Sequence, residues 1–182
     1  MRNEKFLIAF FSRRGDNYVN GKIVDLPVGN TELAARMIQE LTGGDLFQIK
    51  PVKEYPAGYN DTTEVAKQEL ERNARPELEG GLPDLGSCEV IFLGYPNWWG
   101  TMPMPVFTFL ERCNFAGKTV APFCTHEGSG LGHSERDIAR LCPGATLADG
   151  LAIQGARVKA ARADIEAWLS TLVFPDARGK RR

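Results

Sequence analysis

Short, unbroken apolar runs alternate with amphipathic stretches along nearly the whole chain, and this alternation restricts the fold more than any other feature. Two of the clearest runs are residues 6–11 and 89–94. Apolar runs of this length are typical of strands that are buried on both faces of a sheet. Strands that alternate with helices favour a parallel sheet with right-handed crossovers and helices on both faces. We therefore expect an α/β fold: a doubly wound, five-stranded parallel sheet.

The same periodicities predict where the individual elements lie. Strands are expected at residues 6–11, 45–49, 89–94, 119–124 and 145–153, the last one broken near Asp149 and Gly150. Helices are expected at residues 30–41, 61–73, 134–141 and 158–172, and a further helix opens at Pro103. Asp61 is the expected cap of the second helix. Pro122 is unexpected in the fourth strand, because proline lacks the N–H donor that a central strand uses.

Composition and charge exclude several classes of protein. The formal net charge of −1 argues against binding to nucleic acid, since no excess of Lys and Arg is available for a phosphate backbone. No apolar run reaches the ~18 residues that suggest a membrane span. The apolar stretch at residues 6–11 is typical of a first strand rather than a signal peptide, so we expect a cytoplasmic protein without membrane contact. The 4 cysteines lack C-x-x-C spacing and only 2 histidines are present, so no metal site is predicted.

The chain shows no internal boundary before its last residues. No Gly/Ser-rich linker and no internal repeat divides it, so we expect residues 1–174 to form a single domain. Residues 175–182 contain the only basic cluster and are predicted to be a solvated, frayed tail.

In a doubly wound sheet, ligands bind beyond the carboxyl ends of the strands, which directs attention to the loops at residues 12–30, 95–103 and 125–133. The first loop brings Ser12 and Arg13 toward Asn30 and Thr31 at the start of a helix. Hydroxyls and free backbone N–H groups at a helix N-terminus suit a phosphate. An equally good alternative at this point is that Asn30 or Thr31 simply caps the helix.

The second loop contains two adjacent tryptophans, Trp98 and Trp99, between Pro96 and Gly100. Both rings cannot enter the core from so tight a turn, so at least one is expected near the surface. A flat aromatic ligand can stack on an exposed indole. The alternative is that the indole is buried against a neighbouring loop or a protein partner.

The third loop is rich in glycine, at positions 128, 130 and 132. Glycine permits a close approach of the backbone to a ligand, although a mobile loop without function is the alternative. The chain lacks the G-x-x-x-x-G-K-[ST] motif of nucleotide triphosphatases and has no G-x-G-x-x-G after its first strand. These absences disfavour a P-loop protein and a dinucleotide-binding Rossmann domain.

Taken together, these loops resemble those of the flavodoxin family, in particular its flavodoxin-like FMN-binding proteins with a split phosphate loop. Residues 12–15 and 29–31 resemble the two halves of that phosphate loop, with residues 16–28 inserted between them. Residues 95–101 and 122–130 resemble the two loops that bind the flavin ring. The resemblance covers residues 5–172 and implies a flavodoxin-like fold with strand order 2-1-3-4-5 and FMN as the cofactor.

The resemblance also implies which residues contact FMN. Those expected at the phosphate are Ser12, Arg13, Asn30 and Thr31. Those expected at the ring are Pro96, Asn97, Trp98, Trp99, Gly100 and Thr101 in the second loop, and Thr125, His126, Glu127, Gly128, Ser129 and Gly130 in the third. His126 and Glu127 depart from the small residues typical of the family. They are interpreted as surface polar groups rather than as groups that gate the ring or donate a proton. No catalytic residue is predicted.

Three functions are compatible with such a fold. The favoured one is an FMN-dependent oxidoreductase that moves electrons from NAD(P)H to a small acceptor such as a quinone. The second is a non-enzymatic electron carrier between redox proteins, which the near-neutral charge disfavours, because carriers use charge to steer association. A cofactor-free signalling receiver is disfavoured by the absence of an acidic cluster after the first and third strands. The oligomeric state, a homodimer included, and the role of residues 16–28 are left open.

Overall fold

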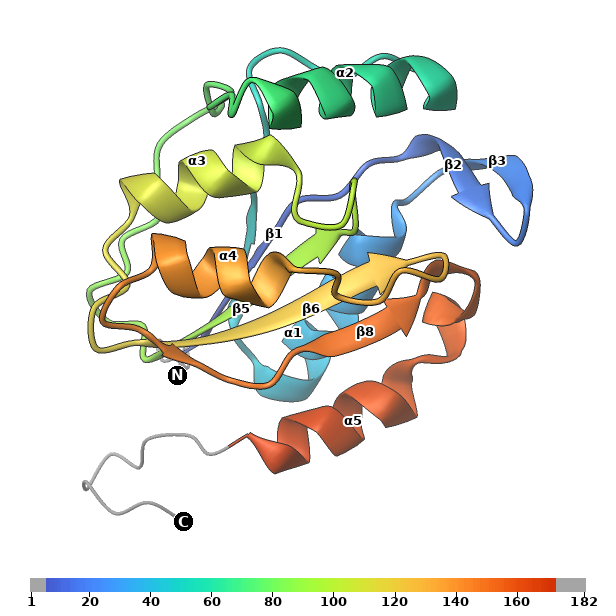
Figure 1. The fold of residues 1–182 in the computed structure, drawn as a ribbon. Helices are drawn as coiled ribbons and strands as arrows, with labels where there is room; N and C mark the ends of the chain where they lie inside the picture. The colour runs from blue at the N-terminus through green and yellow to red at the C-terminus, as the bar shows by residue number, and fades with distance from the viewer. Residues whose placement is uncertain (1–5, 173–182) are drawn as a thin grey trace.

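The computed structural model describes residues 6–172 and contains a parallel sheet between two layers of helices (Figure 1). The sheet has the order β4-β1-β5-β6-β7, and β8 also pairs with β6. Its strands are β1 (Phe6–Phe10), β4 (Asp45–Gln48), β5 (Val90–Pro96), β6 (Thr119–His126), β7 (Thr146–Leu147) and β8 (Leu151–Gln154). Because β7 and β8 are two segments of one strand position, the order corresponds to 2-1-3-4-5. The predicted α/β fold and strand order are confirmed.

Helices cover both faces of this sheet and close two separate apolar clusters. The helices are α1 (Asn30–Thr42), α2 (Tyr59–Glu71), α3 (Met104–Arg112), α4 (Ser134–Leu141) and α5 (Arg162–Thr171), with a short 3₁₀ helix η1 (Gly155–Ala160). Figure 1 shows α2, α3 and α4 on one side of the sheet and α1 and α5 on the other. The first six residues of β5 are buried, which explains its continuous apolar sequence. No helix in residues 6–172 is long and apolar enough to cross a membrane.

The break in the fifth strand position explains Pro122. The predicted interruption near Asp149 and Gly150 is confirmed, since β7 ends at Leu147 and β8 begins at Leu151. On the side of β6 that pairs with β7 and β8, the oxygen of Val120 accepts a hydrogen bond from the N–H of Ala148. Pairing resumes, with β8, only at Phe123. Pro122 therefore faces the interval between the two segments, where no ladder donor is required.

The helix caps differ from the expected ones. α1 has Gly29 at its N-cap, so neither Asn30 nor Thr31 caps it. α2 begins at Tyr59, two residues before Asp61, and has Gly58 at its N-cap. No side chain caps either helix. Asp61 lies in the first turn of α2, after the N-cap, so the prediction that it caps this helix was wrong.

Residues 16–28 contain a β-hairpin that we did not predict. Strands β2 (Gly15–Val19) and β3 (Lys22–Leu26) pair antiparallel and are joined at Asn20 and Gly21, which both have positive φ angles. This is the pattern of a type I′ turn, for which Asn-Gly is the strongest sequence signal. None of residues 16–28 is buried, and Figure 1 shows the hairpin projecting beside α2 at the carboxyl edge of the sheet. The predicted basic tail lies outside the described residues.

Candidate functional site

A cavity of about 580 Å³ opens at the carboxyl ends of β1, β5 and β6. β1 and β5 flank the point where the strand order reverses, the usual ligand site of a doubly wound sheet. The volume lies within the range of about 300–1,000 Å³ that small-molecule sites occupy. Of the residues predicted from sequence, those that line the cavity are Ser12, Arg13, Asn30, Thr31, Pro96, Asn97, Trp98, Trp99, Gly100, Thr125, His126, Glu127 and Ser129.

Three predicted site residues, Thr101, Gly128 and Gly130, do not line the cavity. The buried Thr101 supports the second loop from beneath. Gly128 donates its N–H to Nδ1 of His126 over 2.9 Å. Gly130 accepts a hydrogen bond from the Asn97 amide over 2.8 Å, so the second and third loops are joined at this point.

The N-terminus of α1 presents unpaired donors to the cavity. The hydroxyl oxygen of Ser12 accepts the N–H of Glu32 over 3.1 Å, which holds the end of β1 against the first turn of the helix. The first intrahelical bond runs from Leu33 to Gly29, so the N–H groups of Asn30 and Thr31 have no partner among the described residues. A side chain at Gly29 would overlap Ser12 and Arg13, so only glycine permits this close approach. The arrangement suits an anion.

The side chain of Arg13 has a different set of contacts from the one expected. Its guanidinium donates hydrogen bonds to the backbone oxygens of Asp16, Pro56 and Ala57. Burial lowers the pKa of Arg13, and the nearby Asp16 partly opposes that shift. Because these contacts join the base of the hairpin to the segment before α2, Arg13 positions that wall of the cavity. A contact between Arg13 and a phosphate stays a prediction.

The two tryptophans lie in different environments. Trp98 is half-buried and packs edge-on against Phe11 and Tyr55, with ring centroids 5.2 and 5.0 Å away. Burial raises the pKa of Tyr55, and its hydrogen bond to Glu69 raises it further, so the phenol remains a donor at neutral pH. Trp99 is 50% exposed, and its Nε1 donates to the oxygen of Thr63 in α2 over 2.9 Å. One ring is therefore held near the surface, as expected.

Residues 98–101 form a tight turn in an unusual backbone conformation. Trp98 and Thr101 exchange two backbone hydrogen bonds of 2.9 and 3.2 Å. Trp99 and Gly100 between them have φ angles of 55° and 84°, as in a type I′ turn. A positive φ is unfavourable for a bulky residue such as tryptophan and persists only where the surroundings hold it.

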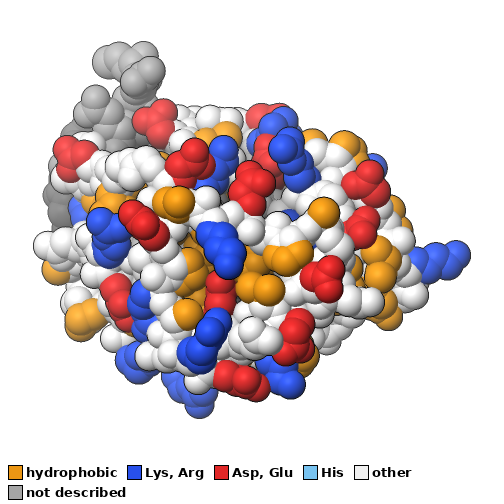
Figure 2. Space-filling model, turned by 90° about the horizontal axis from the view of Figure 1, so that it is seen from above, with side chains coloured by type: hydrophobic (Ala, Val, Ile, Leu, Met, Phe, Trp, Pro, Cys, Tyr) orange, Lys and Arg blue, Asp and Glu red, His pale blue; other side chains and the backbone are white. Residues whose placement is uncertain are grey.

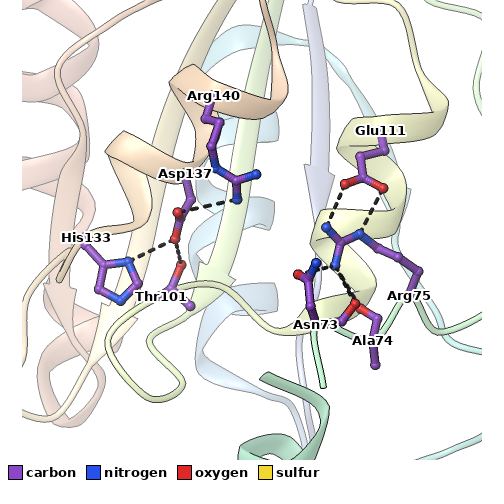
Figure 3. Close-up of polar contacts among 8 residues, drawn as sticks. All are labelled: Asn73, Ala74, Arg75, Thr101, Glu111, His133, Asp137 and Arg140. Carbon is purple, nitrogen blue, oxygen red and sulfur yellow. Dashed lines mark hydrogen bonds and ion pairs between the residues drawn. The ribbon is translucent and has the colours of Figure 1, made fainter. Parts of the chain in front are cut away.

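Side chains of α4 and the residue before it hold this turn in place (Figure 3). The Thr101 hydroxyl donates to the carboxylate of Asp137 over 2.7 Å. Nδ1 of His133 lies 2.9 Å from the same oxygen, and the backbone N–H of His133 donates to Gly100 over 2.8 Å. Arg140 approaches the other carboxylate oxygen at 3.7 Å. Asp137 is therefore the group on which the turn is anchored.

Glu127 connects three segments around the cavity. One carboxylate oxygen accepts the N–H of Ala156 in η1 over 2.8 Å, and the other accepts the N–H of Asn20 at the tip of the hairpin over 3.2 Å. Thr31 and Thr125 share a buried hydrogen bond of 2.8 Å between their hydroxyls, which links the first and third loops. The interpretation of Glu127 as a merely solvent-exposed polar group is therefore corrected, because its carboxylate holds parts of the chain together.

Seven further residues line the cavity and were missed by sequence reasoning: Asn17, Tyr18, Tyr59, Thr62, Thr63, Ala66 and Gly155. Asn17 and Tyr18 lie in the hairpin, which the Asn20-Gly21 pair between alternating residues should have revealed. The four from α2 carry no sequence signal of their own, since a polar surface helix has the same pattern.

Known proteins resemble this chain along most of its length. A family model described as Flavodoxin matches residues 25–172. A candidate flavoprotein from Bacteroides eggerthii is 28% identical, with 91% of this chain and 98% of that chain covered and a TM-score of 0.69. A candidate flavoprotein from Bacteroides uniformis is 29% identical, with 89% and 97% covered and a TM-score of 0.70. A flavoprotein from Lactobacillus acidophilus, solved in complex with FMN, is 19% identical, with 91% and 98% covered and a TM-score of 0.61. No curated protein matches.

Proposed function

The chain belongs to the flavodoxin family, and on that basis we propose that its cavity binds FMN and that the protein moves electrons from NAD(P)H to a small acceptor such as a quinone. One observation carries the proposal: a single cavity joins the unpaired N–H groups of α1 to the aromatic turn at Trp98 and Trp99. This combination matches a ligand with an anionic end and a flat aromatic end.

The residues present fit FMN at both ends. Asn30 and Thr31 offer backbone donors to the phosphate, and the Ser12 hydroxyl keeps its own hydrogen free to donate, because its oxygen is the acceptor for Glu32. The second loop presents aromatic surface to the ring, and the third loop adds Thr125, His126, Glu127 and Ser129 to the lining. Bound FMN would supply the redox chemistry. The protein's own contribution is to orient the cofactor and to surround it with fixed dipoles.

Two observations support an enzyme over a carrier. The cavity has a wall beyond the three loops, built by the hairpin and α2, against which a small molecule can bind beside the cofactor. Basic and acidic side chains are interspersed over the face that α2 covers (Figure 2), and the formal net charge is −1. A surface of this kind supplies little long-range attraction for a charged protein partner.

Stopped-flow spectroscopy of the FMN-loaded protein tests the proposal. NADH or NADPH is expected to bleach the flavin absorbance faster than it bleaches free FMN, and a quinone is expected to restore it. The rate should change little between low and high salt, because steering by charge is not involved. Bleaching no faster than free FMN, combined with rapid reduction by a flavoprotein reductase, would contradict the enzyme and support the carrier.

A further inference from the structure

The wall formed by the hairpin and α2 has a composition unlike that of the three loops. Tyr18 from β2 and Tyr59 from α2 stack with ring centroids 6.0 Å apart and an interplanar angle of 29°. Thr62, Thr63 and Ala66 continue the wall along α2. The wall is therefore aromatic at one end and small and uncharged at the other.

The hydrogen-bonding groups of this wall are divided into satisfied and free ones. The hydroxyl of Thr62 donates to Pro56 over 2.8 Å, and that of Thr63 donates to Asn60 over 2.7 Å. The phenol hydroxyls of Tyr18 and Tyr59 make no hydrogen bond to the described residues. Burial raises the pKa of Tyr59, so its hydroxyl remains protonated and can donate. Two phenol donors thus lie beside aromatic surface.

Arg13 and Glu127, two charged residues that line the cavity, are already engaged with backbone. Arg13 donates to the oxygens of Pro56 and Ala57, and Glu127 accepts the N–H groups of Asn20 and Ala156. Among the described residues that line the cavity, Arg13 is the only lysine or arginine. The described lining therefore offers no free cation to the phosphates of a nucleotide, and the nearest exposed lysine of α2, Lys67, lies over the Trp99 ring outside it. The phenols of the wall suit carbonyl oxygens.

We propose that Tyr18, Tyr59 and the adjacent face of α2 form the acceptor subsite, and that it binds a flat, uncharged aromatic dicarbonyl compound, that is, a quinone. This inference rests on the proposed function, since the subsite serves the acceptor of that same cavity. The ring of the quinone packs on the tyrosines and on Ala66, and its carbonyl oxygens accept hydrogen bonds from the phenols. Nicotinamide nucleotides should bind this wall less tightly than a quinone, because no lysine or arginine of its described lining is free for their phosphates.

The test measures binding without turnover. Isothermal titration calorimetry of the oxidised, FMN-loaded protein with 2-methyl-1,4-naphthoquinone, in the absence of any electron donor, gives the dissociation constant of the subsite alone. Tyr18→Ala should raise that constant about tenfold, because it removes both a stacking surface and a donor. Tyr18→Phe should give a smaller increase. Ile23→Ala is the matched control, since Ile23 is the cross-strand partner of Tyr18, is exposed and does not line the cavity.

The outcomes separate this inference from the proposed function. A parent protein that does not bind the quinone, or a Tyr18→Ala variant that binds it as tightly as the parent, overturns the subsite even if NADH bleaches the flavin. An oxidised nicotinamide dinucleotide whose affinity falls as much as the quinone's in Tyr18→Ala also overturns it. Quinone binding that depends on Tyr18 supports the subsite even if neither nicotinamide reduces the flavin. FMN affinity, measured by fluorescence, should be equal in the parent and in Ile23→Ala, because Ile23 does not line the cavity.

Discussion

The carboxylate of Glu127 accepts the backbone N–H of Asn20, 107 positions earlier in the chain, and so ties the third loop to the tip of the hairpin. The same side chain holds Ala156 in η1. Since the hairpin contributes Asn17 and Tyr18 to the cavity, and Glu127 itself lines it, this contact connects two parts of the lining. The tip of the hairpin is therefore held to the third loop by the side chain of Glu127.

Glu127→Ala should release FMN about tenfold faster. Hydrogen bonds to a charged group contribute about 1.5–3 kcal/mol each, and of these two the bond from Ala156 is partly buried and the bond from Asn20 is exposed. The rate is measured from the recovery of flavin fluorescence after dilution. Glu135→Ala is the control, because Glu135 also accepts a backbone N–H, from Gly150, but does not line the cavity. Equal release rates in the two variants would show that the contacts of Glu127 with the hairpin and η1 do not retain the cofactor.

FMN should bind more tightly than riboflavin by at least about two orders of magnitude, because each hydrogen bond to the phosphate contributes about 1.5–3 kcal/mol. Ser12→Ala should narrow this gap, since it removes one donor and loosens the contact with Glu32. Ser170→Ala serves as the control, because Ser170 bonds only within α5. Titration of the apoprotein measures all the affinities. Equal affinities for FMN and riboflavin would contradict the prediction that the N-terminus of α1 binds the phosphate.

Trp98→Ala and Trp99→Gly should have different effects. The first removes packing on Phe11 and Tyr55 and should lower the free energy of unfolding by about 2 kcal/mol, as expected for a half-buried aromatic residue. The second should cost less than about 1 kcal/mol, because glycine relieves the positive φ while the Thr63 contact is lost. Urea unfolding measures the stabilities. One of the two variants should also weaken FMN and relieve quenching of flavin fluorescence; if neither does, the tryptophans serve another surface.

Replacing residues 16–28 with two glycines should leave the fold intact and change turnover or acceptor choice. The ends to be joined are Gly15 and Gly29. Gly29 packs directly against Ser12 and Arg13, so a short link can join them, and no residue of the segment is buried. Circular dichroism and thermal unfolding measure the fold, and quinone reduction measures the activity. Loss of folding would mean that the contacts of Arg13 and Tyr59 with the hairpin are required for the domain.

Arg75→Met should lower stability at neutral pH but not in acid. Arg75 binds both carboxylate oxygens of Glu111, over 2.6 and 2.8 Å, and this hydrogen bonding lowers the pKa of Glu111 (Figure 3). The stabilisation is present above the ordinary Glu pKa and is lost as the pH falls through the lowered value. The difference from the parent at pH 7 should not exceed about 1 kcal/mol, because the pair is exposed.

Urea unfolding curves at a series of pH values measure this effect. The control is an ion pair whose two members lie in the same helix. Arg36→Met removes the Arg36–Glu32 pair of α1 and should have a smaller effect at neutral pH, because such i,i+4 pairs contribute only about 0.3–0.5 kcal/mol. If the Arg75→Met variant is still less stable than the parent at pH 2, the electrostatic explanation is contradicted, and lost packing on Phe107 is indicated instead.

The sequence by itself determined the sheet and the edge at which the ligand loops meet, and the resemblance of those loops to the flavodoxin family implied the strand order. Buried strands such as β5 show their burial directly in a continuous apolar run, and handedness rules then leave few topologies. The two tryptophans were placed correctly for the same local reason, since a tight turn cannot bury both. Strand burial and the exposure of a turn residue depend on neighbours a few positions away in the chain, so the sequence alone can predict them.

Only the tertiary structure decided how the cavity is closed. Arg13 binds the carbonyl oxygens of Pro56 and Ala57 rather than standing free, and Tyr18 meets Tyr59 across 41 positions of sequence. Pro122 became intelligible only once the gap between β7 and β8 was seen beside it. Such contacts depend on how whole elements pack against one another. A side chain's type does not reveal which distant backbone group it will find, so this part of the site had to come from the fold.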